Sequence, residues 1–361
     1  MSKKLSYYSV VNKQKSPGVF KKIQGTVAAF NTIGVEATNK YYSNSSRDNI
    51  RFLKEMLFDP SDVLIVRYFD RLFLLVFFIM TIKRCFGTKI IVDIPTPCSI
   101  ALKEVDTFKT SNYKKFIRKS AVFLMGSWIF WPAHRVIQYA EEKSKWFSFG
   151  LKHKTLTIGN GIWIDASIPI VKPSYSTTEC LNLIAVAQLA NWHGYDRLIR
   201  ALSLFIKKHP QRRVAFTIVG DGEAKEELVG LVEELNLQSI VVFTGLLKGE
   251  SLNMAFNEQH IGVSSLGLYR IHLEEASVLK TREYMARGLS VIAAGNDSDF
   301  IHDEKFRLMV PNNDSVEEIV ELLVWLTENE LPEPSLVRKF AEENLSMQVK
   351  VERILQGLVS Y

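Results

Sequence analysis

The sequence predicts an α/β protein with two Rossmann-like domains that face each other across a cleft, each a parallel sheet covered by helices. The chain has 361 residues, and a domain usually takes about 150. Short β-branched runs alternate with longer helical patterns along the chain, as in proteins with parallel sheets. Residues 168–178 carry two prolines and a polar cluster, which is typical of a linker.

Five runs in the first half are predicted to be strands: residues 5–11, 63–68, 89–94, 135–139 and 155–158. Helical patterns separate these runs and begin near Gly18, Asp48, Asp70, Asn112 and Glu141. The sequence therefore predicts a first domain over residues 1–167, followed by the linker at 168–178.

The second half repeats this alternation, with strands predicted at residues 182–188, 214–219, 240–243, 262–265 and 290–293. After Phe306 the strand signal fades, and residues 315–327 and 334–358 have helical patterns. We expect a second domain over 179–340 and a C-terminal helix over 341–361, long enough to cross back and pack on the first domain.

Charge is divided unevenly between the halves. The net charge is +6, but residues 1–165 hold 26 Lys and Arg against 12 Asp and Glu, whereas residues 166–361 hold 19 against 27. A basic half suits an anionic substrate, a membrane surface or a nucleic acid. We do not expect a nucleic-acid partner, because the basic residues are dispersed and form no reading motif.

Composition and motifs exclude several classes of protein. Hydrophobic residues make up 47% and charged residues 23%, as in ordinary folded proteins. The three cysteines form no CxxC pair and the seven histidines no metal-binding spacing, so neither a disulfide framework nor a protein-bound metal is expected. No signal peptide is recognisable, which together with few cysteines fits a cytoplasmic protein.

Two apolar stretches, residues 72–82 and 121–131, are too short to span a bilayer. The second follows a basic segment closely, so residues 103–131 either lie against an anionic membrane surface or form a buried helix with a solvated basic approach.

The segment 275–288, EASVLKTREYMARG, contains the most informative candidate site. A break in helical pattern near Ser277 places Glu275 in a loop and Glu283 on the first turns of a helix. Two carboxylates suit a ligand with several hydroxyls, while the helix N-terminus and Lys280 suit a phosphate. This combination describes a nucleotide sugar. The alternative is an ordinary helix with Glu and Lys on its solvent-exposed face.

Four segments together, at residues 191–197, 216–222, 241–245 and 275–288, resemble the nucleotide-binding half of glycosyltransferase family 4, the group 1 glycosyltransferases of GT-B fold. The resemblance covers most of residues 181–300. It implies a retaining hexosyltransferase of EC class 2.4, with a UDP- or GDP-sugar as donor. Glu283 is then expected to bind the ribose hydroxyls and Glu275 the donor sugar, with Lys280 stabilising the leaving group and the catalytic base unassigned.

Ser277, Gly222, Gly245 and His193 are further donor-side candidates. The family commonly has two cations where this chain has Gln188 and His193. His193 would supply charge only if it were protonated, and it could instead be a residue that simply starts a helix.

In the first half, Gly18 is predicted to open a helix. Its lack of a Cβ either lets a phosphate approach the backbone at the helix N-terminus, or is needed only because the turn from strand to helix has no room for a side chain. Asp93 and Thr96, around the motif DIPTP, are the acceptor-side candidates, although a structural turn explains them equally well.

These observations predict a glycosyltransferase that moves sugar from a nucleotide donor to a lipid-linked glycan, in bacterial-type surface polysaccharide synthesis. It would lie in the cytoplasm, peripheral to the inner face of the plasma membrane. Two alternatives remain open: a nucleotide-sugar epimerase of the same fold and a non-catalytic partner subunit.

Overall fold

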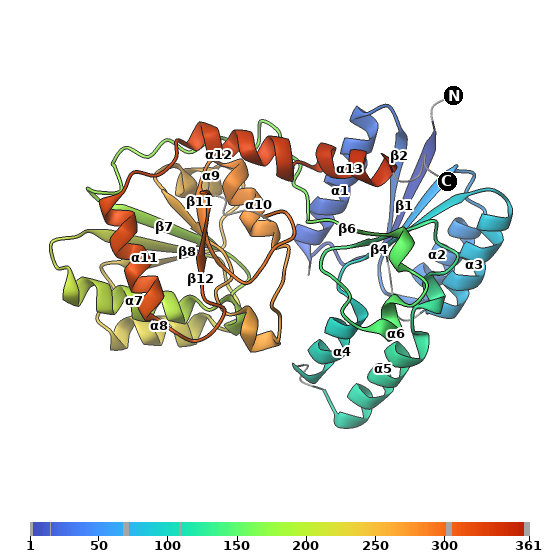
Figure 1. The fold of residues 1–361 in the computed structure, drawn as a ribbon, viewed down its shortest axis with the longest axis horizontal. Helices are drawn as coiled ribbons and strands as arrows, with labels where there is room; N and C mark the ends of the chain where they lie inside the picture. The colour runs from blue at the N-terminus through green and yellow to red at the C-terminus, as the bar shows by residue number, and fades with distance from the viewer. Residues whose placement is uncertain (1–2, 15, 68–71, 108–109, 301–304, 357–361) are drawn as a thin grey trace. The chain divides into compact units, whose positions relative to one another are not determined.

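The structure is a computed structural model that describes residues 3–14, 16–67, 72–107, 110–300 and 305–356. The chain divides into two compact units: unit 1 is Met1–Trp163 with Ser346–Tyr361, and unit 2 is Ile164–Leu345. Figure 1 shows that each unit is a sheet flanked by helices. Two all-parallel sheets confirm the predicted fold class.

Unit 1 begins with alternating strands and helices: β1 (Lys4–Val10), α1 (Pro17–Thr32), β2 (Glu36–Tyr42), α2 (Ser46–Leu57), β3 (Val63–Arg67), α3 (Phe73–Cys85) and β4 (Lys89–Ile94). It continues with α4 (Cys98–Thr107), α5 (Asn112–Met125), η2 (Trp128–Phe130), β5 (Arg135–Gln138), α6 (Lys145–Ser148), η3 (Lys152–Lys154) and β6 (Thr155–Thr157). Its strand order is β2-β1-β3-β4-β5-β6.

Unit 2 contains β7 (Leu181–Val186), η4 (Asn191–His193), α7 (Tyr195–Lys208), β8 (Val214–Val219), α8 (Lys225–Glu234), β9 (Val241–Gly245), α9 (Glu250–Asn257) and β10 (Ile261–Val263). It continues with η5 (Leu268–Ile271), α10 (Leu279–Ala286), β11 (Ser290–Ala294), β12 (Arg307–Val310), α11 (Glu317–Glu328), α12 (Pro334–Phe340) and the π-helix η6 (Ala341–Leu345). Its strand order is β12-β11-β10-β7-β8-β9.

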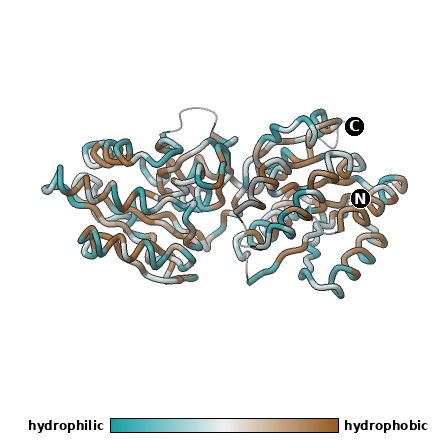
Figure 2. The backbone as a smooth tube through the Cα atoms, turned by 90° about the horizontal axis from the view of Figure 1, so that it is seen from below, coloured by the Kyte–Doolittle hydropathy of each residue, from teal (hydrophilic) through white to brown (hydrophobic). Residues whose placement is uncertain are grey.

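The central strands are nearly continuous apolar runs because helices cover both faces of each sheet. In β3 (VLIVR) four residues are buried, and in β4 (KIIVDI) five are. Figure 2 shows the same pattern, with hydrophobic strands between helices that alternate in hydropathy.

The C-terminal helix α13 (Met347–Gln356) returns to unit 1 and packs on α1, as the sequence predicted. Met347, Val351 and Ile354 are buried in the core that α1 shares with β1 and β3. Gly161 permits this approach, since a Cβ there would lie 2.8 Å from the Lys350 side chain and 3.0 Å from Met347 Sδ.

Several predicted elements differ from those observed. The edge strands β2 and β12 and the helix α4 were not predicted, and the helix expected near Glu141 is reduced to the four residues of α6. The helix predicted over 334–358 is interrupted, because the π-helix η6 separates α12 from α13. The predicted start near Asp70 lies outside the described residues.

The segment predicted as a linker runs along unit 2. Val171 donates its backbone N–H to Arg287 O at 2.9 Å, and Thr177 donates its hydroxyl to Asn329 O at 3.1 Å. The chain passes between units at Trp163 and Ile164 and returns at Leu345 and Ser346.

Across the described ranges, no helix is both long and apolar enough to cross a membrane.

Candidate functional site

The topology of unit 2 picks out one edge of its sheet. The strand order reverses at β7, which lies between β10 and β8. In open parallel sheets, ligands bind beyond the carboxyl ends of the strands at such a switch point. Here those ends are Val186 of β7 and Val263 of β10.

Helix α10 is fixed against these strands by polar contacts. The Tyr284 hydroxyl accepts a hydrogen bond from Val186 N at 2.8 Å, and the Thr281 and Ser264 hydroxyls lie 2.8 Å apart. Gly262 of β10 lets the helix come close, because a Cβ there would lie 2.3 Å from the Tyr284 ring. These contacts bring the first turns of α10 to the carboxyl ends of β7 and β10.

Lys280, in the first turn of α10, points to the start of α7. Its ammonium donates to the Tyr195 hydroxyl at 3.0 Å and lies 5.8 Å from the centre of the Trp192 ring. Burial lowers the pKa of Lys280 to about 7. An anion would favour the charged form of this lysine, so the site is suited to a phosphate.

His193 is neutral at physiological pH, so it does not supply the charge that the sequence allowed for. Burial, together with the nearby Lys280, lowers its pKa to about 2. Its Nδ1 accepts a hydrogen bond from Ala190 N at 3.1 Å, which leaves the proton on Nε2. His193 can therefore act as a neutral donor. The other departure from the family, Gln188, is exposed.

Glu283 lies in the second turn of α10, as its spacing predicted. Its carboxylate pairs with Arg287, one turn later, at 3.3 Å. Arg287 is held in place because it also donates to Asn253 at 2.9 Å and stacks on Phe256 at 4.2 Å. Arg287 thus fixes the orientation of the Glu283 carboxylate. The Glu283 side chain is 28% exposed, so the carboxylate is still accessible to a ligand.

Glu275 lies in the predicted loop and is fixed through its backbone. It forms an isolated parallel bridge with Asn296, just after β11, and Ala276 N donates to Asn296 O at 2.9 Å. Ser277 follows in the same loop, and the helix begins at Leu279. Glu275, Ser277, Lys280 and Glu283 thus belong to one loop and helix at the end of β10 and β11.

The glycine candidates differ in what surrounds them. A Cβ on Gly222 would lie 2.2 Å from Leu189 O, so this glycine is required by close contact between two loops. Gly245 ends β9 with a φ of 71°, and in the part of the chain that the structure describes no atom lies within 4 Å of the point where its Cβ would be. Gly245 therefore leaves room for a ligand.

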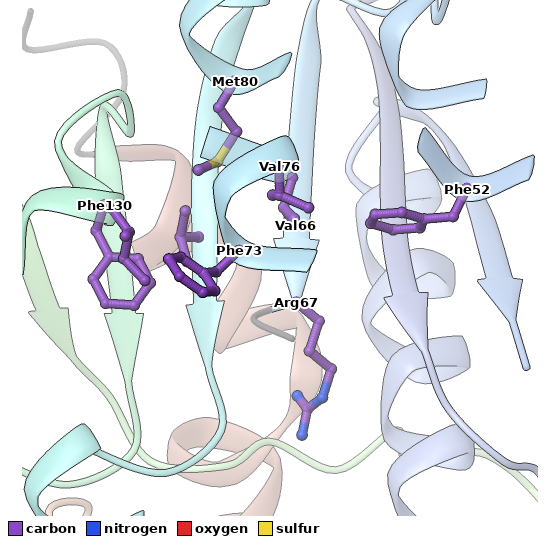
Figure 3. Close-up of a pocket in the computed structure, with 9 residues that line it drawn as sticks. Phe52, Val66, Arg67, Phe73, Val76, Met80 and Phe130 are labelled. Atoms are coloured by element: carbon purple, nitrogen blue, oxygen red, sulfur yellow. The ribbon is translucent and has the colours of Figure 1, made fainter. Parts of the chain in front are cut away.

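In unit 1, Asp93 is buried in a polar cluster. Arg67 donates to its carboxylate at 2.7 Å, and the Tyr7 hydroxyl donates to the same oxygen. Burial would raise the pKa of Asp93, but Arg67 and Lys22 outweigh it and lower the pKa. Figure 3 shows Arg67 at one end of an apolar pocket, with its guanidinium directed away from Val66 and Phe73.

The remaining unit 1 candidates are more accessible than Asp93. Gly18 is the second residue of α1 and is exposed, and Thr96 lies half-buried in the bend after β4. All donor-side candidates except Gly18 lie in unit 2.

Sequence reasoning missed three residues of the site. Tyr195 and Trp192 contact Lys280, although they precede it by more than 80 residues. The position of Arg287, four residues after Glu283, could have revealed the ion pair, since such residues are neighbours on a helix.

Among the described residues, no cluster of His, Cys, Asp and Glu could hold a metal ion.

Comparisons with known proteins concern the family of residues 181–329 and the fold of the whole chain. Residues 181–329 match the family model described as Glycosyl transferases group 1. The chain is similar in structure to Anabaena Alr3699/HepE in complex with UDP-glucose, at 14% identity and a TM-score of 0.67, covering 99% of this chain and 100% of that one. Among curated proteins, none matches the chain in sequence.

Two further solved structures cover 99% of this chain and 99% of their own. The lipopolysaccharide outer core galactosyltransferase WaaB is 9% identical with a TM-score of 0.63. Sucrose-phosphate synthase from Thermosynechococcus elongatus is 13% identical with a TM-score of 0.61.

The two parallel sheets have the GT-B fold of these solved structures, and together with the family match they indicate a glycosyltransferase, an enzyme of EC class 2.4. Residues 181–329 match the group 1 glycosyltransferases, the family that the motifs of this half resemble.

Proposed function

We propose that this enzyme transfers a hexose from a UDP-sugar to a lipid-linked glycan with retention of configuration, in bacterial-type surface polysaccharide synthesis. The observation that carries the donor half of the proposal is the position of Lys280, at the start of α10 and 3.0 Å from Tyr195. A cation and free helix N–H groups at a switch point suit a diphosphate.

The site residues have distinct proposed roles. Glu283, oriented by Arg287, would accept hydrogen bonds from the ribose hydroxyls. Glu275 would bind the donor sugar, and Ser277, His193, Gly222 and Gly245 would line the donor. Lys280 would stabilise the negative charge that develops on the leaving diphosphate, the kind of electrostatic contribution that dominates many enzymatic rates. No catalytic base is assigned.

UDP is the preferred nucleotide because the Anabaena neighbour is a complex with UDP-glucose. A glycan acceptor is supported by the likeness to WaaB, a lipopolysaccharide outer core galactosyltransferase. Asp93 lies in a buried ion pair, so any role in acceptor binding would be through the position of Arg67 and Tyr7. The enzyme would act in the cytoplasm, at the inner face of the plasma membrane.

A thermal-shift screen with UDP-, GDP-, dTDP- and ADP-sugars tests the donor. UDP-sugars should raise the melting temperature most, since a ligand that binds only the folded state stabilises it. If none of the four raises the melting temperature, the chain is better explained as a non-catalytic partner. An epimerase would convert the UDP-sugar without any acceptor, so product analysis in the absence of acceptor separates that alternative.

A further inference from the structure

Helix α3 is apolar on both of its faces. Its inner face buries Val76, Ile79 and Met80 against the core of unit 1. Its outer face exposes a stripe at helical spacing, which consists of Leu74, Leu75, Phe78 and Ile82 and ends at the adjoining Phe86. Phe78 is 58% exposed. The described residues of unit 1 leave this outward stripe uncovered, so it is available to something outside the chain.

Helix α5 has a second outward apolar stripe, combined with positive charge. Tyr113, Phe116, Ile117, Phe123 and Leu124 are all exposed. Phe116 is 68% exposed and Leu124 is 70% exposed. Between positions 112 and 125 the sequence has four Lys or Arg and no Asp or Glu.

Contacts through Trp128 connect the two helices. Phe77 of α3 meets Trp128 of η2 edge to face at 5.1 Å, and Trp128 Nε1 donates to Leu124 O of α5 at 3.1 Å. On the other side of α5, Phe123 stacks on Trp146 of α6 with ring centres 5.6 Å apart. Figure 1 shows α5 and α6 in the same part of unit 1. We call α3, α5, η2 and the exposed Trp146 the aromatic surface.

The positive charge of this surface indicates the kind of partner that it binds. Segments 72–86 and 111–131 contain six Lys or Arg and no Asp or Glu. Lysine is depleted in protein interfaces, whereas exposed Trp, Phe and Leu beside Lys and Arg suit the headgroup region of an anionic bilayer. Helix α3 has 13 residues, too few to cross the roughly 30 Å hydrocarbon core of a bilayer.

We propose that the aromatic surface docks unit 1 onto a membrane containing anionic lipid, with α3 and α5 lying in the plane of the interface. This extends the contact beyond residues 103–131, for which the sequence left membrane contact as one of two alternatives, because α3 adds four exposed apolar side chains. The inference deepens the proposed function and rests on it for its purpose: the surface would hold the enzyme where a lipid-linked acceptor resides.

Co-sedimentation with vesicles tests this proposal in the full chain. The protein should bind phosphatidylcholine vesicles containing phosphatidylglycerol, and bind pure phosphatidylcholine far more weakly. K114Q removes one positive charge and should weaken vesicle binding about fivefold, because each Lys or Arg near an anionic membrane surface strengthens binding by about that factor. Raising the salt concentration should weaken it further.

The apolar contribution is tested by F78Q on α3 and L124Q on α5. Each should weaken vesicle binding on the order of tenfold, because a large apolar side chain then stays out of the lipid. The matched control is I50Q, which removes a 68% exposed side chain from α2 of the same unit and should leave binding unchanged. Melting temperatures of all variants verify that each remains folded.

Three results separate the possible outcomes. If wild-type protein does not bind anionic vesicles although UDP-sugars still raise its melting temperature, the docking proposal is wrong and the proposed function stands. Vesicle binding without any response to nucleotide sugars would count against the proposed function alone. A third result would be wild-type protein that does not bind vesicles but forms a dimer in sedimentation velocity. If F78Q and L124Q abolish that dimer, the docking proposal is overturned and the aromatic surface is an interface between copies of the chain.

Discussion

The Lys280 ammonium donates a hydrogen bond to the Tyr195 hydroxyl at 3.0 Å, which joins the start of α10 to the start of α7. Both helices begin at the carboxyl ends of neighbouring strands in the sheet. Burial makes this lysine easy to deprotonate, with a pKa of about 7. The contribution of Lys280 to anion binding therefore depends on whether its side chain is protonated near neutral pH.

Binding of UDP-glucose should depend on pH through Lys280. The diphosphate stabilises the protonated lysine and raises its pKa, so affinity should be greatest below about pH 7 and decline as the pH rises above it. Titration calorimetry between pH 6 and pH 9 measures this, with proton uptake seen as a dependence on buffer ionisation enthalpy. K280M should bind weakly at every pH. An unchanged pH dependence in K280M would assign it to another group.

Gly220 and Gly230 should respond in opposite ways to alanine. A Cβ at Gly220 would lie 1.8 Å from Ala187 O, in a backbone conformation with a φ of 136°, so G220A should lower the free energy of unfolding by about 3 kcal/mol. At Gly230, in helix α8, a Cβ meets no described atom within 4 Å, so G230A should raise it by about 0.5–1 kcal/mol. Thermal and urea unfolding provide the comparison. Equal effects of the two substitutions would argue against the close contact between the loops after β7 and β8.

Helix α13 should be part of the stability of unit 1. Ile354 is buried against α1, so I354A should cost about 2–5 kcal/mol through lost contacts and a cavity. Hydrogen exchange should increase in unit 1 and stay unchanged in β7 and β8 of unit 2. The exposed neighbour Glu352 provides the control E352A, which should leave exchange unaffected. Faster exchange in unit 2 alone would contradict this packing.

Secondary structure was predictable where tertiary context agrees with local pattern. The apolar runs of β4 and β8 were predicted at their observed bounds, because both strands are covered by helices. The edge strand β2, EATNKYY, was missed because only two of its seven residues are buried and its sequence is polar. The short edge strand β12 was missed for a similar reason: its four residues carry too little pattern.

The site was predictable in its residues and not in its contacts. Spacing alone placed Glu275 in a loop and Glu283 on a helix. The contact of Lys280 with Tyr195, and the burial that neutralises His193, depend on loops that are distant in sequence and meet only in the folded sheet. No local pattern carries that information.

We propose above all that α10 and the loop before it bind the nucleotide sugar. Titration calorimetry of UDP-glucose with wild type, E283Q and the surface control E233Q tests it most directly. Wild type and E233Q should bind equally, whereas E283Q should lose at least tenfold in affinity, since hydrogen bonds to a charged group contribute about 1.5–3 kcal/mol. Equal affinities for E283Q and wild type, with both proteins folded, would contradict the claim.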